Sequence, residues 1–163
     1  MIVLNLGCGH VGEDMPGFVN LDRNPAYGDR TGWKVDDGLR RWADGSVDAV
    51  TVSHLMMYVP LHTWHLLLDE VARVLKPGGH VRVTEDVIDD PASRHWMGHD
   101  PLHSSWKGRV VTAMTTQLVV GMLGMSGIAA REVGREETSC PVDIRQDRHG
   151  GPPHTFYVEG VKP

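Results

Sequence analysis

The feature that most constrains this fold is a glycine-rich turn placed directly after a short apolar run at the start of the chain. Residues 2–6 read Ile-Val-Leu-Asn-Leu, and Gly7, Cys8 and Gly9 follow at once. A short apolar run bounded by a turn signal predicts a buried strand. Glycine lets the backbone turn sharply and approach a ligand with no Cβ in the way. The opening of the chain therefore predicts a strand followed by a ligand-binding turn.

Apolar runs and turn signals divide the rest of the chain into alternating strands and helices. We expect further strands over residues 18–22, 33–36, 47–53, 80–86, 128–135 and 155–161, and helices over residues 60–75 and 110–125. Such alternation predicts an α/β fold with a parallel sheet. With 163 residues, of which 40% are hydrophobic, the chain is long enough for one domain, residues 1–163, and too short for two.

The helix over residues 60–75 has the clearest pattern. Its apolar residues recur at three- and four-residue steps, and this spacing predicts one buried face made of Leu61, Trp64, Leu68, Val71 and Leu75. Pro77-Gly78-Gly79 follows and is expected to end the helix.

Composition and charge limit the partners. A net charge of −5 gives no basic footprint for a phosphate backbone, so a DNA partner is disfavoured. Residues 110–130 carry no charge and are long enough to span a bilayer, but their threonines and glycines favour a buried helix followed by a strand. Two cysteines and the lack of a secretory leader indicate a cytoplasmic protein. We expect a monomer or homodimer with no membrane segment.

Three carboxylates stand at the ends of the expected second and third strands. Asp22 ends the second, where it can accept hydrogen bonds from both hydroxyls of a ribose. Asp36 and Asp37 end the third, where either can accept from the exocyclic amine of adenine. The same residue type is common in turns. The carboxylates therefore fit an adenosine-type cofactor without deciding which one.

The string from Gly7 to Gly12, Gly-Cys-Gly-His-Val-Gly, also matches the dinucleotide fingerprint. That interpretation requires a crossover helix whose N-terminus faces a pyrophosphate. The stretch between Gly9 and Phe18 is too short for one and contains Pro16 and Gly17. A ligand without a diphosphate is favoured.

The order of these motifs resembles the class I methyltransferases that use S-adenosylmethionine, in particular a small branch with a Leu-Asn-Leu-Gly-Cys-Gly signature. Here the signature spans residues 4–9, and it is followed by Gly-Phe-Val-Asn-Leu-Asp at 17–22 and Asp-Gly-Ser-Val-Asp-Ala-Val at 44–50. Residues 70–79, Glu-Val-Ala-Arg-Val-Leu-Lys-Pro-Gly-Gly, are similar to another family element. The resemblance covers residues 2–86. It implies a Rossmann-like, mostly parallel sheet of seven strands, with the last strand antiparallel.

The resemblance also implies a cofactor site for S-adenosylmethionine. Gly7 and Gly9 would pass under the methionine and ribose, Asp22 would hold the ribose, and Asp36 or Asp37 would hold the adenine. The full expected set is Asn5, Gly7, Cys8, Gly9, His10, Asp22, Arg23, Asp36, Asp37, Ser53 and His54.

The chain departs from the family at two places. The branch often has Leu-Glu-His where this chain has Met56-Met57-Tyr58, so that histidine's role does not carry over. Helical segments usually found before the first strand are also missing, which leaves the methyl acceptor open. Residues 87–108 are expected to form an irregular lid over the site.

Histidines are the candidate general bases if the acceptor must lose a proton. His54, His99 and His103 are the candidates, with His103 preferred and His54 second. His95, His99 and His103 are spaced by four, but Gly98 and Pro101 argue against one helix, so no metal site is expected.

Three functions remain open at this point. The first is a methyltransferase acting on a small molecule or an exposed group of a macromolecule. The second is a non-catalytic module that binds S-adenosylmethionine or a partner, and the third is an NAD-dependent oxidoreductase. The Asp/Asn-Pro-Pro-Tyr/Phe element of enzymes that methylate exocyclic base amines is absent after residue 53, which again disfavours DNA.

Overall fold

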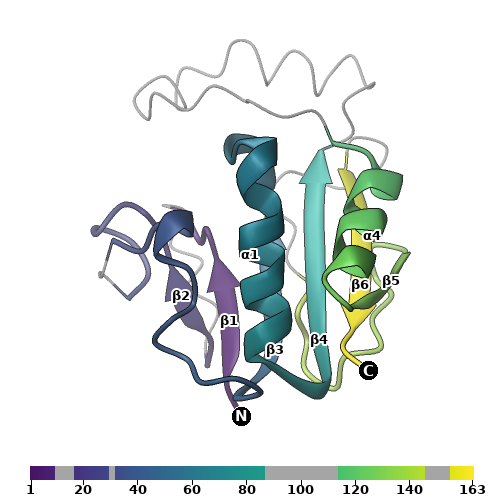
Figure 1. Cartoon of the computed structure of the whole chain (residues 1–163), viewed down its shortest axis with the longest axis horizontal. Helices are drawn as coiled ribbons and strands as arrows, with labels where there is room; N and C mark the ends of the chain where they lie inside the picture. Colours follow the sequence, from purple (N-terminus) through teal and green to yellow (C-terminus); the bar gives the residue numbers. More distant parts are fainter. Residues whose placement is uncertain (10–16, 30–31, 87–113, 146–154) are drawn as a thin grey trace.

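A single six-stranded sheet forms the centre of the protein (Figure 1). The computed structural model describes residues 1–9, 17–29, 32–86, 114–145 and 155–163. The strand order is β2-β1-β3-β4-β6-β5. The strands are β1 (Val3–Leu6), β2 (Val19–Leu21), β3 (Val47–Ser53), β4 (Leu75–Asp86), β5 (Ala129–Glu132) and β6 (Thr155–Val161). Neighbours from β2 to β4 are parallel, and β6 is antiparallel to β4 and β5. The mostly parallel α/β fold with an antiparallel last strand is confirmed.

The strand expected over residues 33–36 is wrong. These residues lead into a short 3-10 helix, η1 (Val35–Asp37). The carboxylate of Asp37 accepts a hydrogen bond from the backbone N–H of Lys34 at 3.0 Å, which closes the turn. The indole of Trp33 donates to the carbonyl of Gly38 at 2.8 Å. The described residues therefore form six strands where seven were expected.

The junction between helix α1 (Leu61–Val74) and β4 also differs from the prediction. Leu75 is already extended and begins β4, so Pro77-Gly78-Gly79 lies inside the strand and does not end the helix. The backbone N–H of Gly78 donates to the carbonyl of Lys162 at 2.8 Å, which ties this part of β4 to the end of the chain. The register with β3 shifts beside it, between Val47 and Ala49.

Helix α4 (Thr116–Met125) confirms the later part of the second expected helix. It starts later than predicted, because the side chain of Thr115 caps it by accepting from the backbone N–H of Leu118 at 3.2 Å. Residues 110–113 lie outside the described residues. No helix in the described part of the chain is long and apolar enough to cross a membrane.

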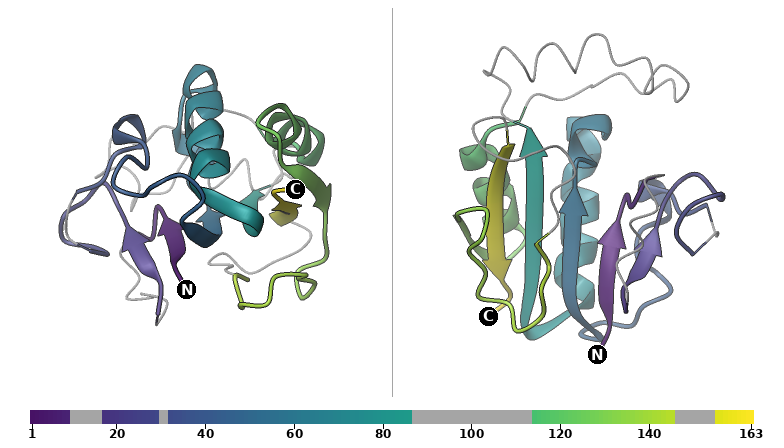
Figure 2. Two further views of the ribbon diagram at one scale, coloured as in Figure 1. Left: turned by 60° about the horizontal axis from the view of Figure 1, so that its bottom comes forward. Right: turned by 180° about the vertical axis from the view of Figure 1, so that it is seen from behind.

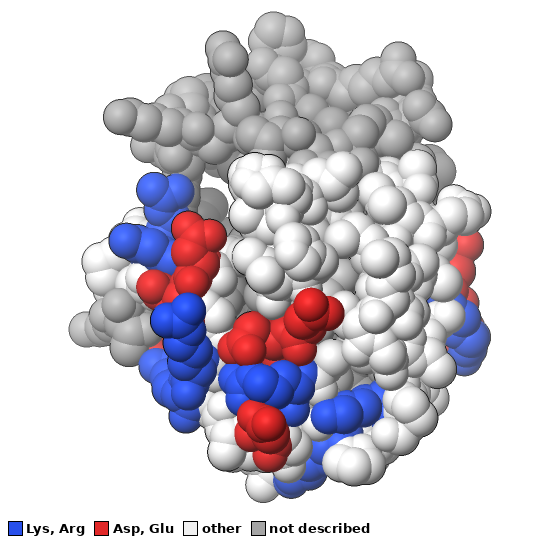
Figure 3. Space-filling model, viewed as in Figure 1, with Lys and Arg blue, Asp and Glu red and all other residues white. Residues whose placement is uncertain are grey.

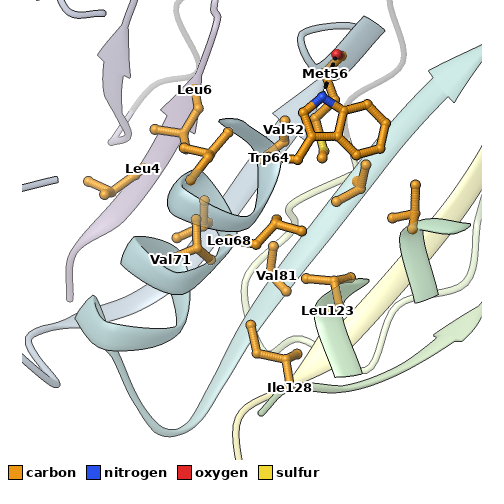
Figure 4. Packing of buried hydrophobic residues seen from close by; sticks show 14 of the residues in the cluster. Leu4, Leu6, Val52, Met56, Trp64, Leu68, Val71, Val81, Leu123 and Ile128 are labelled. Carbon is orange, nitrogen blue, oxygen red and sulfur yellow. Dashed lines mark hydrogen bonds between the residues drawn. The ribbon is translucent and has the colours of Figure 1, made fainter. Parts of the chain in front are cut away.

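The main core lies between the sheet and the two described helices, which cover the same face (Figures 1 and 2). Trp64, Leu68 and Val71 of α1 are buried as predicted, whereas Leu61 is 49% exposed. The indole N–H of Trp64 donates to the carbonyl of Met56 at 3.2 Å and so joins α1 to the chain after β3 (Figure 4). This packing fixes the carboxyl end of β3 against the helix layer.

Candidate functional site

The expected site lies at the carboxyl edge of the parallel strands. Leu6 of β1 is paired with Leu21 of β2 and with Val52 of β3. The residues that follow this row are Gly7, Asp22 and Ser53, so the register places them next to one another. The arrowheads of β1, β3 and β4 all point to this edge, as the view from behind shows (Figure 2, right). Ligands of open α/β sheets bind outside the carboxyl ends of the strands.

The glycine turn after β1 has the backbone conformation that its sequence predicts. Gly7 and Gly9 have positive φ angles of 72° and 66°, which side chains other than glycine rarely adopt. The backbone N–H groups of Gly7 and Cys8 donate to the carbonyl of Leu21 at 2.8 and 3.0 Å. Cys8 itself is buried, with its sulfur close to Gly28. Cys8 therefore offers a ligand its backbone rather than its thiol.

Asp22 is held rigidly against this turn. Its Oδ2 accepts from the backbone N–H of Gly9 at 2.7 Å, and its Oδ1 accepts from that of Asn24 at 2.9 Å. The residue is only 6% exposed. A carboxylate has about four lone-pair positions, so about two remain on Asp22 beyond these bonds. Asp22 is thus a buried hydrogen-bond acceptor whose orientation is fixed at this edge.

Two residues of the expected set flank Asp22 in different ways. Asn5 is fully buried, and its amide donates to the side-chain oxygen of Asn20 at 2.8 Å. Asn5 therefore joins β1 to β2 beneath the edge. Arg23 directly follows Asp22 and is exposed.

Asp36 and Asp37 lie in η1, and both are exposed. Asp37 already accepts the N–H of Lys34 at 3.0 Å, as part of the turn. Of the two, Asp36 has the carboxylate that is not used in this cap. The structure places the pair on η1 rather than at the end of a strand.

Ser53 is the last residue of β3, and His54 follows it. Ser53 is fully buried, and His54 is 8% exposed. His54 has a φ of 50°, the one positive φ of a residue other than glycine among the described residues. Its backbone N–H donates to the carbonyl of Thr84 at 2.8 Å, and its Nδ1 lies 3.5 Å from Oδ1 of Asp86.

Glu85, whose carboxyl group is buried beside this turn, is not among the site residues expected from the sequence. Glu85 is 0% exposed, and its Oε1 accepts from the backbone N–H groups of Leu55 at 2.9 Å and Met56 at 2.7 Å. Burial raises the pKa of Glu85 to about 7, against the charge of His54 and the backbone donors, which lower it. The signal was an acid at an inward position of an alternating strand, after Val81 and Val83.

Several expected site residues lie outside the described residues. These are His10, the preferred base His103, the alternative His99, and the lid segment 87–108. In the part of the chain that the structure describes, no three His, Cys, Asp or Glu side chains are grouped so that they could hold a metal ion.

Charged side chains of both signs mix on the face seen in Figure 3. They gather over η1 and the lower part of α1, where Arg73 bonds to Glu70 at 2.7 Å and to Asp44 at 2.6 Å. Helix α4 contributes no charge. This face of the described residues presents no surface of a single sign.

One family profile matches part of the chain. The profile of the methyltransferase domain family matches residues 23–83, from the end of β2 into β4. This segment is similar to a methyltransferase domain. The signature over residues 4–9 precedes the matched segment. No curated protein matches the chain.

Solved structures share the fold over almost the whole chain. A methyltransferase dependent on S-adenosylmethionine from Mesorhizobium loti is 21% identical, with a TM-score of 0.62, over 98% of this chain and 90% of that one. Another from Archaeoglobus fulgidus is 14% identical, with a TM-score of 0.63, over 98% and 85%. A chain from a Haloferax volcanii complex that contains the Trm112 methyltransferase activator is 19% identical, with a TM-score of 0.62, over 99% and 82%. The domain thus has the fold of S-adenosylmethionine-dependent methyltransferases.

Proposed function

We propose that this chain is an S-adenosylmethionine-dependent methyltransferase whose acceptor is a small molecule or an exposed group of a macromolecule. One observation carries the proposal beyond the family match: the buried carboxylate of Asp22 is tied to the glycine turn at the carboxyl edge of the sheet. This arrangement suits a ribose beside a tight glycine turn.

The residues present fit the adenosine and methionine parts of the cofactor. Asp22 has about two lone-pair positions for the ribose hydroxyls. Gly7 and Gly9 supply the left-handed turn proposed to pass beneath the methionine. Asp36, whose carboxylate is outside the η1 cap, is the better candidate of the two η1 acids for adenine. His10 and Arg23 are proposed near the two ends of the cofactor, and Ser53, His54 and the backbone of Cys8 near its middle.

The chemistry needs little from the protein beyond position. When bound, the cofactor supplies an activated methyl group on its sulfonium. The chain must hold the acceptor atom in line with that carbon at about 3 to 3.5 Å. A base is required only for an acceptor that loses a proton, and His54 and His103 remain the candidates.

A ligand panel tests cofactor choice. The thermal unfolding of the whole chain is measured with S-adenosylmethionine, S-adenosylhomocysteine and NAD. A ligand present at 100 times its Kd adds about 2.7 kcal/mol of apparent stability, and we expect this for the first two ligands. A shift with NAD and none with the others would support the oxidoreductase and overturn the proposal.

Methyl transfer, as distinct from cofactor binding, is tested by a separate assay. Formation of S-adenosylhomocysteine is measured against a panel of small-molecule, protein and RNA acceptors. His54→Asn and His103→Asn are compared with His62→Asn, a change of an exposed histidine on α1. Loss of turnover in one of the first two variants alone assigns the base. Tight cofactor binding without turnover on any acceptor would identify a non-catalytic module.

A further inference from the structure

We propose that Glu85 is a positioning residue for the cofactor site: its carboxylate holds the turn after β3 in a strained shape that places Leu55 against Gly7. This inference rests on the proposed function, because it assigns Glu85 a role in cofactor binding. The evidence is a set of contacts that runs from β4 to the glycine turn.

Three consecutive residues of β4 contact the turn. The carbonyl of Thr84 accepts from the backbone N–H of His54 at 2.8 Å, and Oδ1 of Asp86 lies 3.5 Å from the imidazole Nδ1 of His54. Between them, Oε1 of Glu85 accepts from the backbone N–H groups of Leu55 and Met56. The turn is therefore held through its backbone and its side chain at once.

The turn needs such support because its backbone is strained. His54 has a φ of 50°, and a residue with a side chain in this region costs about 1 kcal/mol or more. Strain of this kind persists only where the surroundings fix it. The two N–H groups that follow His54 both point to Glu85, so the carboxylate is the group that fixes the residues after the strained one.

The position of Leu55 is transmitted to the glycine turn. A Cβ built on Gly7 would lie 3.0 Å from both Cβ and Cδ1 of Leu55, so the Leu55 side chain lies directly beside the Gly7 backbone. If Glu85 releases the N–H of Leu55, this packing loosens and the glycine turn after β1 loses the side chain that supports it. We expect weaker cofactor binding as a result.

A buried carboxyl group at this position destabilises the fold, because it loses its hydration. Glu85 is fully buried on the face of the sheet that carries Val81 and Val83, and its Oε2 has no hydrogen-bond partner among the described residues. The titratable groups near Glu85 are His54 in the turn and Asp86 on β4, while β6 places Phe156 opposite Glu85. An apolar residue would fill this site at lower cost, which points to a use for the acceptor.

The charge state of Glu85 should make cofactor affinity depend on pH. Its pKa of about 7 means that it ionises within the range where binding is measured. Bonds to an ionised acceptor are roughly twice as strong as neutral ones. Affinity for the cofactor should therefore rise as the pH rises from about 6 to 8. A residue with only a packing role would not produce this profile.

The experiment measures the Kd of S-adenosylhomocysteine by titration calorimetry between pH 6 and 8. It compares the whole wild-type chain with Glu85→Gln, which keeps the shape and removes the charge. The control is Glu132→Gln, the same change on an exposed residue of β5. We expect Glu85→Gln to bind about tenfold more weakly at pH 8 and to lose the pH dependence, and Glu132→Gln to match the wild type.

Hydrogen exchange at the amides of Leu55 and Met56 provides a second readout that needs no ligand. Faster exchange in Glu85→Gln, with other protected amides unchanged, supports the role and excludes general unfolding. Equal exchange and equal Kd in the two chains would overturn the positioning role alone. Persistence of the pH dependence in Glu85→Gln would assign it to another group and also overturn the role. If wild type binds no S-adenosylhomocysteine, the proposed function fails first and the role in cofactor binding fails with it.

Discussion

The backbone N–H of Gly9 lies 2.7 Å from Oδ2 of Asp22, so the turn after β1 and the end of β2 form one unit. The contact connects residues thirteen positions apart in the sequence. It fixes the acceptor that we propose for the ribose before any ligand arrives.

Asp22→Ala should weaken binding of S-adenosylhomocysteine by about 100-fold, because two bonds to a charged acceptor are lost at about 1.5 kcal/mol each. Asp22→Asn, which keeps one acceptor oxygen, should fall between this variant and the wild type. Calorimetry gives the Kd, and thermal unfolding without ligand verifies that each variant is folded. Asp69→Asn, on an exposed residue of α1, serves as the control. Unchanged affinity in Asp22→Ala would remove Asp22 from the site.

Gly28→Ala should destabilise the protein far more than Gly45→Ala. Both glycines have left-handed backbone conformations, with φ of 56° and 60°. A Cβ in that region therefore destabilises each variant by about 1 to 2 kcal/mol. At Gly28 the added Cβ would lie 2.3 Å from the carbonyl oxygen of Asn20, whereas nothing lies within 4 Å at Gly45. Denaturant unfolding should give a loss of at least about 3 kcal/mol for Gly28→Ala. Similar losses in both variants would contradict the close approach.

Glu85 should make stability fall as the pH rises. Its pKa is raised from 4.5 to about 7 in the folded state, so the folded chain holds this proton more tightly than the unfolded chain. The stabilisation is complete below pH 4.5 and is lost as the pH rises through about 7. Relative to Glu85→Gln, the wild type should lose about 3 kcal/mol of unfolding free energy over this window. Denaturant curves at several pH values test this, and parallel profiles for the two chains would refute it.

Arg82→Met should cost about 3 to 5 kcal/mol, the usual result of breaking a buried ion pair. The Arg82 side chain is buried, and its Nη1 lies 3.4 Å from Oε2 of Glu159. It also donates to the backbone carbonyls of Gly134, Arg135 and Glu137. Arg82→Lys should restore little, because an ammonium cannot make the same forked set of bonds. Arg131→Met breaks an exposed pair with Glu137 and should cost less than about 1 kcal/mol. Chemical denaturation compares the three variants, and equal losses at Arg82 and Arg131 would show that burial of the pair is not decisive.

Part of the site could be predicted because its signals are local. The apolar run at residues 47–53 and the strand at 155–161 appear with the expected bounds, and Gly7 and Gly9 have the conformation that their sequence implies. The lid over residues 87–108 and the base His103 stay predictions, since they lie outside the described residues.

Other features had competing local signals. The sequence of residues 33–36 predicted a strand. The hydrogen bond between the Asp37 carboxylate and the Lys34 N–H stabilises a 3-10 helix over an extended edge strand. Leu61 matched the periodic face of α1, yet it lies on the first turn of the helix and remains 49% exposed. Pairing with Val47 drew Leu75 into β4, although Pro77-Gly78-Gly79 predicted a break.

By itself the sequence determined most of the order of strands and helices, the bend at Gly7 and Gly9, and the presence of an acid at Asp22, since these depend on neighbouring residues. Only the tertiary structure decided which partners these groups meet. Glu85 reads as an ordinary charged residue in a strand, and the parallel register of β3 and β4 carries it under the amides of Leu55 and Met56. Contacts between residues thirty positions apart depend on sheet register and burial, and no local pattern encodes them.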